Sequence, residues 1–199
     1  MWPIACPFGL ELILGSVGLT QHLRRIVEAA VRYAGPGEEV VGIVPAEPSS
    51  GARAYLCAYR SETGETSWLV LDEEGKPVEN RVRIREVVSI AALVELAEET
   101  AGGGDLEELR SQLVALRLTE NPAGIDEADE AALALEEAIG AAPRVATPER
   151  LDAIGAATLR LERVLGGEGS PFAVAMKQAT ATVEELTRDV EAAYKVPLD

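Results

Sequence analysis

Apolar residues recur at two different periods along the chain, and the change of period separates its parts. From Thr20 onward the apolar positions follow helical spacing and stop at the Gly35-Pro36-Gly37 breaker, which predicts a helix over residues 20–34. The period then shortens to two residues in four short segments: 40–44, 53–59, 68–71 and 78–84. Because turn-forming residues separate these segments, the pattern predicts a four-stranded antiparallel meander.

Helical spacing returns after the strands. Residues 88–101 are predicted to form a helix that covers one face of the sheet, and the three glycines 102–104 end it. Four further segments each have one narrow apolar seam, as helices of bundles do. These seams run over residues 106–116, 125–139, 151–165 and 176–193.

Helix-start signals support the last two of these helices. Thr147 stands before Pro148 and Ser170 before Pro171, so each pair places a capping hydroxyl ahead of a proline in the first turn. The glycine-rich link 166–169 predicts that the two helices fold back as an antiparallel hairpin.

The sequence therefore predicts an α+β fold in three parts. An apolar N-terminal strap, 1–18, precedes an α+β sheet domain, 19–104, in which an N-terminal helix leads into the helix-covered meander. An acidic all-α helical bundle or hairpin follows over 105–199. Single-seam helices can bury one another or lend an apolar stripe to a second subunit, so both arrangements stay open.

Charge limits the partners that the chain can have. The sequence has 34 acidic residues against 18 lysines and arginines, a net charge of −16, and the first 60 residues are balanced at five of each sign. A surface of this sign repels nucleic-acid backbones and anionic membranes, so we expect neither as a partner. The two cysteines indicate a reducing compartment, and no apolar run is long enough to span a membrane, so we predict a cytoplasmic protein.

Few residues are suited to catalysis. His22 is the sole histidine, which removes two-histidine metal sites and most catalytic triads. We expect a surface or half-buried histidine at this position.

One segment resembles a known catalytic motif. Residues 94–102, Val-Glu-Leu-Ala-Glu-Glu-Thr-Ala-Gly, resemble the second half of the Nudix box of Mg²⁺-dependent pyrophosphohydrolases. The resemblance implies that Glu95, Glu98 and Glu99 hold the metal that bridges a diphosphate, with Glu86 upstream as a further ligand.

The segment also departs from that motif. Val94 stands at the arginine position, Asn80 at the first glycine and Ala101 at the later glycine. The competing interpretation is a helix whose Leu93 side faces inward while its glutamates are solvated.

A second acidic pattern resembles the all-α nucleotide pyrophosphohydrolases of the MazG type. Glu127 and Glu130 stand three residues apart, as do Glu149 and Asp152 further along the chain. In an antiparallel hairpin these pairs lie at opposite ends, about 20 Å apart at 1.5 Å of rise per residue. Acidic first turns are also expected from the helix dipole alone.

Two further groups are candidate binding residues. Arg24 and Arg25 begin a small basic strip on an otherwise acidic chain. Tyr55, Tyr59 and Trp68 lie on adjacent predicted strands, where they would form either an aromatic platform or part of the core.

Our leading hypothesis is a non-enzymatic protein-interaction or regulatory protein that needs no cofactor and binds another protein or itself through amphipathic helices. One alternative is a divergent Nudix-like pyrophosphohydrolase that uses Mg²⁺. Another is a small-molecule-binding module with a pocket between the sheet and the first helix, lined by Tyr55 or Trp68.

Overall fold

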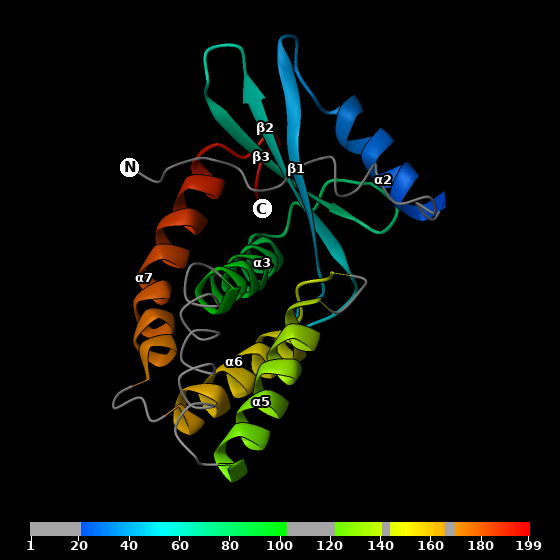
Figure 1. Ribbon diagram of the computed structural model, residues 1–199. Helices are drawn as coiled ribbons and strands as arrows, with labels where there is room; N and C mark the ends of the chain where they lie inside the picture. The colour runs from blue at the N-terminus through cyan, green and yellow to red at the C-terminus, as the bar shows by residue number, and fades with distance from the viewer. Residues whose placement is uncertain (1–20, 103–121, 141–143, 166–169) are drawn as a thin grey trace. The chain divides into compact units, whose positions relative to one another are not determined.

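The computed structural model describes residues 21–102, 122–140, 144–165 and 170–199, and these contain five helices and a three-stranded antiparallel sheet (Figure 1). The elements in chain order are α2 (Gln21–Arg32), β1 (Glu38–Ala46), β2 (Ala54–Ser61), β3 (Thr66–Asp72), α3 (Arg81–Gly102), α5 (Pro122–Gly140), α6 (Pro148–Val164) and α7 (Pro171–Ala192). The predicted first helix and the last three helices are confirmed. The predicted strap 1–18 and the seam 106–116 lie outside the described residues.

The chain divides into two compact units. One unit, here called the sheet unit, comprises residues 1–91 and 184–199, and the other, the helical unit, comprises residues 92–183. Helices α3 and α7 each contribute residues to both units. Of the three glycines that the sequence suggested as a boundary, Gly102 is the last residue of α3, and the other two are outside the described residues.

The sheet packs one face against α2. Its strand order is β1-β2-β3, and Cys57 at the centre pairs with Ile43 on one side and Leu69 on the other. The predicted period of two places alternate residues of all three strands on the face that packs against α2. This core consists of Ile26, Ala29, Ala30, Ile43, Tyr55, Cys57, Tyr59, Leu69 and Leu71. The fold class is therefore mixed α and β, as the alternation indicated.

The predicted fourth strand, 78–84, is wrong, because a helix begins within it. The Oδ1 atom of Asn80 accepts a hydrogen bond from the backbone N–H of Arg83 at 2.9 Å, which caps the first turn of α3. Helix α3 then buries Ile84, Val87 and Val88 at spacings of three and one, a helical pattern rather than an alternating one. The apolar residues Val78, Val82 and Ile84 stand at even-numbered spacings, which is typical of a strand. In the structure, however, Val82 is 66% exposed.

A short C-terminal segment closes the outer edge of β3. Tyr194 forms a parallel bridge with Trp68. The Trp68 N–H donates to the carbonyl of Ala193 at 3.0 Å, and the Lys195 N–H donates to the carbonyl of Trp68 at the same distance. These bonds satisfy backbone groups that an edge strand otherwise leaves open.

Side chains of the same segment fasten it to the sheet unit. The Tyr194 hydroxyl accepts from the Val70 N–H at 2.9 Å and donates to the Val78 carbonyl at 2.7 Å. The Lys195 ammonium pairs with Glu38 at the start of β1. Nothing in the sequence pattern pointed to these contacts, because they join residues more than a hundred positions apart.

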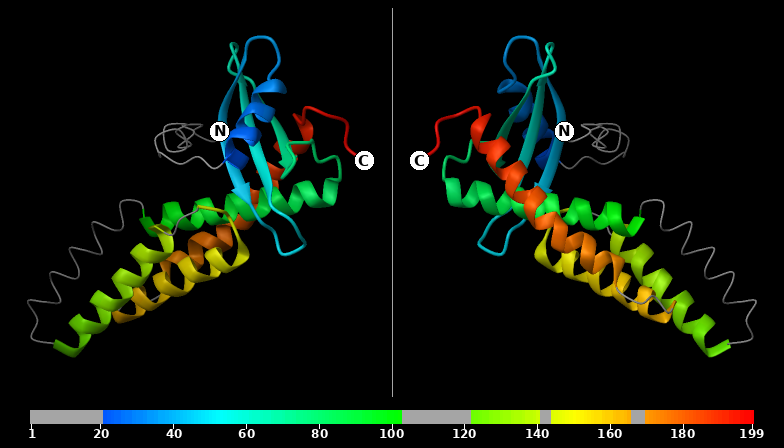
Figure 2. Two further views of the ribbon diagram at one scale, coloured as in Figure 1. Left: turned by 90° about the vertical axis from the view of Figure 1, so that its right-hand side faces the viewer. Right: turned by 90° about the vertical axis from the view of Figure 1, so that its left-hand side faces the viewer.

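In the helical unit, α5 and α6 run side by side (Figure 2). The predicted caps are present, since the Thr147 hydroxyl accepts from the Arg150 N–H at 3.1 Å and the Ser170 hydroxyl from the Ala173 N–H at 3.1 Å. Glu162 near the end of α6 also accepts a hydrogen bond from the first turn of α7, at the Phe172 N–H. None of the described helices is long and apolar enough to cross a lipid bilayer.

Candidate interaction surfaces

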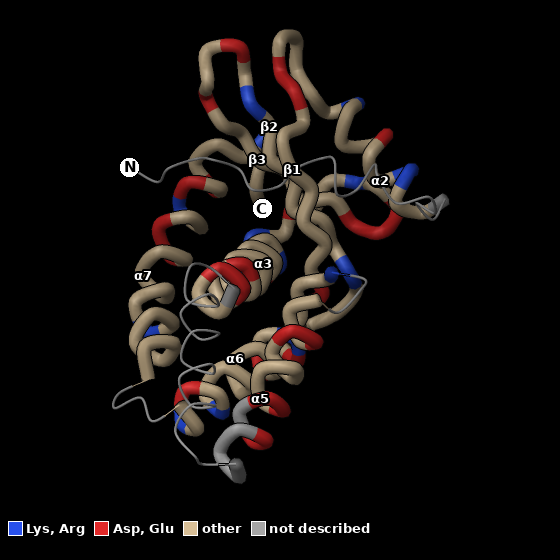
Figure 3. The backbone as a smooth tube through the Cα atoms, viewed as in Figure 1, with Lys and Arg blue, Asp and Glu red and all other residues tan. Residues whose placement is uncertain are grey.

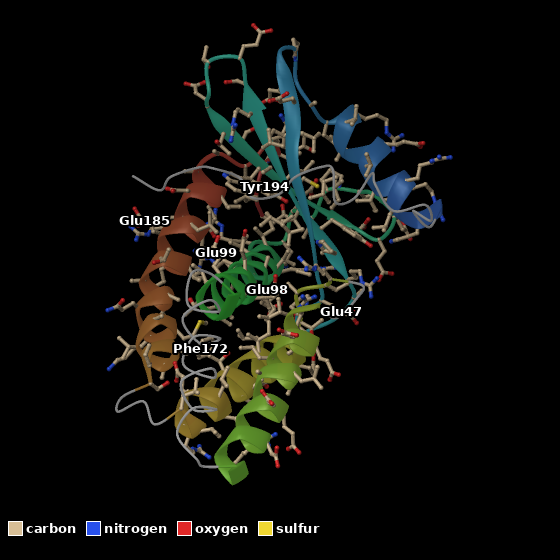
Figure 4. The ribbon with its side chains drawn as sticks, viewed as in Figure 1. Glu47, Glu98, Glu99, Phe172, Glu185 and Tyr194 are labelled. Atoms are coloured by element: carbon tan, nitrogen blue, oxygen red, sulfur yellow. The ribbon has the colours of Figure 1, made fainter. Side chains whose placement is uncertain are left out.

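The glutamates of the Nudix-like segment lie on the last turns of α3 (Figure 4). Spacings of three and four residues place Glu95, Glu98 and Glu99 on one side of the helix. Glu98 Oε1 accepts a hydrogen bond from Arg150 Nη2 at 2.5 Å, and that nitrogen also donates to the Ile139 carbonyl at 2.9 Å. The Arg150 side chain is only 8% exposed, so a buried guanidinium holds Glu98.

Glu95 lies in a different electrostatic environment from an ordinary surface carboxyl group. Burial, together with the charges of Glu99 and Glu98, raises the pKa of Glu95 to about 7. This carboxyl group is therefore partly protonated at neutral pH.

Glu86 does not join the other three carboxylates. It precedes Glu95 by nine residues of the same helix, a rise of about 14 Å and about half a turn away around the axis. The hydroxyl of Ser50 donates a hydrogen bond to Glu86 instead. Among the described residues, no group of three or more histidines, cysteines, aspartates or glutamates is arranged to hold a metal ion.

The second acidic pattern is spread over the outside of α5 and α6. Glu127, Glu149 and Asp152 are exposed. Glu130 pairs across the hairpin with Arg160 at 3.2 Å. That ion pair is itself exposed, so it contributes little to stability.

The three aromatic residues do not form a common platform. Tyr55 and Tyr59 are fully buried in the core against α2. Trp68 pairs with Ala58, which is one residue out of phase with the tyrosines, and so lies on the opposite face of the sheet. Tyr55 packs with Ile26, Ala29 and Ala30 of α2 in this core.

A polar network that the sequence did not indicate links α2 to β2. His22 Nε2 lies 2.7 Å from the Tyr55 hydroxyl, and Arg53 two residues earlier pairs with Glu47 at 3.2 Å. Burial raises the pKa of Tyr55, and the nearby Arg53 partly opposes that rise. His22 is half-buried, as expected, and it supplies the buried tyrosine with a hydrogen-bond partner.

The basic strip predicted on α2 is exposed. Arg24, Glu28 and Val31 follow spacings of four and three residues, and Arg25 and Arg32 flank them, so the five share the side of α2 that faces away from the sheet core. Val31 is 58% exposed. We call these five residues the α2 strip.

The outer face of α5 has the opposite charge. Asp126, Glu130, Leu133 and Glu137 follow spacings of four, three and four residues and are all exposed; we call these four residues the α5 face. Leu133 is 57% exposed in the middle of this row. The helix has six acidic residues and neither lysine nor arginine, and red segments follow its described part in Figure 3.

Sequence and structure comparisons give no independent guide to these surfaces, since no protein-family model, curated protein or solved structure matches the chain.

Proposed function

We propose that this chain is a non-enzymatic interaction protein that binds a partner helix on the α5 face. The observation that carries the proposal is Leu133, a large aliphatic side chain 57% exposed between carboxylates on the side of α5 that faces away from the buried Ala131 and Leu135. A single exposed leucine is common on protein surfaces. Here, however, it lies at the centre of a face that is otherwise uniformly charged.

The chemistry of the α5 face defines the partner. Burying Leu133 fully would contribute about 1.5 to 3 kcal/mol, while the surrounding carboxylates would repel any acidic partner. The complementary surface is an amphipathic helix with an aliphatic residue between lysines or arginines, because residues at i, i+3, i+4 and i+7 of two helices can interdigitate.

Binding of a synthetic basic amphipathic helix tests this proposal. We expect calorimetric titration to give a dissociation constant on the order of 10 to 100 μM, and Leu133→Ser to weaken binding about tenfold or more. Val174→Ser is the matched control, since Val174 is 56% exposed on α7 in the same unit and should not affect affinity. Equal losses in both variants, or unchanged binding by Leu133→Ser, would contradict the proposal.

The second candidate is the Mg²⁺-dependent pyrophosphohydrolase, and the observation in its favour is the pKa of about 7 at Glu95, a value suited to a general acid or base. Calorimetric titration with Mg²⁺ and Mn²⁺, beside a panel of nucleoside diphosphates, separates the candidates. We expect neither saturable metal binding nor hydrolysis. Binding and turnover by the natural sequence that a Glu98→Gln, Glu99→Gln double variant loses would establish the enzyme instead.

A further inference from the structure

The two exposed helix faces described above are complementary in charge. The α2 strip has three arginines and one glutamate, and the α5 face has three carboxylates. Each has one exposed aliphatic residue, Val31 or Leu133, at nearly equal exposure. The α2 strip thus has the chemistry of the partner helix that the α5 face requires.

We propose that the α5 face of one copy of this chain docks on the α2 strip of a second copy. This inference rests on the proposed function, because it names the partner of the same face. In the docked pair Val31 meets Leu133, and Arg24, Arg25 and Arg32 face Asp126 and Glu137, while Glu130 keeps its ion pair with Arg160. Opposite charges would set the register of the two helices, and the aliphatic pair would exclude water at the centre.

The pairing joins two different surfaces, so a docked pair still has one free α2 strip and one free α5 face. Such head-to-tail contacts either close into a ring or continue into a chain. From Arg24 to Arg32 the strip extends about 12 Å, and from Asp126 to Glu137 the face extends about 17 Å, at 1.5 Å per residue. A contact of that length falls below the area of a permanent interface, so association is weak and reversible.

Charge reversal tests the inference without touching either core. Sedimentation velocity at low salt should show a mean mass that increases with protein concentration, and salt at about 0.5 M should abolish the increase. Arg24→Glu with Arg25→Glu should weaken association at least tenfold, and so should Asp126→Arg with Glu137→Arg. All four positions are exposed, and circular dichroism would check that each variant is folded.

The decisive experiment restores the charge complementarity between the α2 strip and the α5 face. A mixture of the two reversed variants, or one chain with all four substitutions, should recover the mass increase because each reversed face again meets its opposite. A monomer at all concentrations, or a mixture that stays monomeric, overturns docking between copies. The basic-helix titration is measured on the same samples: if the helix still binds at the α5 face, only the second copy is excluded as partner, and if it does not bind, the proposed function fails as well.

Discussion

Arg150→Met is expected to lower the free energy of unfolding by about 3 kcal/mol, the low end of the roughly 3 to 5 kcal/mol lost when a buried ion pair is broken. The substitution preserves most of the side-chain volume but removes the guanidinium that bonds to Glu98 and to the Ile139 carbonyl. Glu98 would then be left partly buried beside two other glutamates. Its 23% exposed side chain keeps the loss at the lower end of the range for buried pairs. Urea unfolding followed by circular dichroism measures the change.

Two controls separate the lost ion pair from lost packing. Arg163→Met alters an exposed arginine of the same helix and should change stability by less than about 0.5 kcal/mol. Adding Glu98→Gln to Arg150→Met removes the stranded charge and should recover part of the loss, because the two groups are coupled. A loss below about 1 kcal/mol, or no recovery in the double variant, would show that the pair does not hold the helices together.

Much of the helical part of the fold was predictable, because its signals are local. The seams of α6 and α7 bury Ile154 and Leu161, and Ala179 and Val190, at the spacings that the sequence shows. Caps are equally local, since hydroxyl, proline and amide lie within four residues of one another. The incorrect strand prediction also came from a local signal, the even spacing of apolar residues between Val78 and Ile84. In the structure, Asn80 caps the first turn of a helix within this segment.

Contacts between distant residues had no comparable signal. Tyr194 lies next to Trp68 in the folded chain, but the sequence gives no period that connects residues so far apart. The same holds for His22 and Tyr55, and for Arg150 and Glu98. Tyr55, Tyr59 and Trp68 were candidates for one surface because they lie on adjacent predicted strands, but strand phase separates the tryptophan from the tyrosines.

Candidate surfaces were predictable to the extent that they depend on composition. The arginines at positions 24 and 25 were recognisable as an exposed strip, and the structure adds that Val31 belongs to it. Leu133 was not recognised, because the apolar seam of its helix passes through Ala132 and Leu135 and gives no reason to single out an additional leucine. Its significance depends on exposure, which a sequence pattern does not measure.

Glu95→Gln is expected to stabilise the protein above neutral pH and to have a smaller effect in mild acid. The folded protein holds the pKa of Glu95 at about 7, above the ordinary value of 4.5 in the unfolded chain, so the folded state binds more protons between these values. The contribution of Glu95 to the free energy of unfolding therefore falls as pH rises through this window. Below about pH 4.5 both states are protonated and the penalty is absent.

The change should be measurable after allowance for solvent screening. A shift of this size, discounted because the group is partly exposed, corresponds to a gain of about 1.5 kcal/mol for Glu95→Gln at about pH 8 relative to about pH 5. Urea unfolding at the two pH values measures it, with Glu137→Gln on the exposed face of α5 as the matched control. The gain arises because the amide retains the shape of the carboxyl group while removing the cost of burying a charge and the repulsion from Glu99 and Glu98. Equal stability differences at both pH values would show that folding does not raise the pKa of Glu95, and would contradict this prediction.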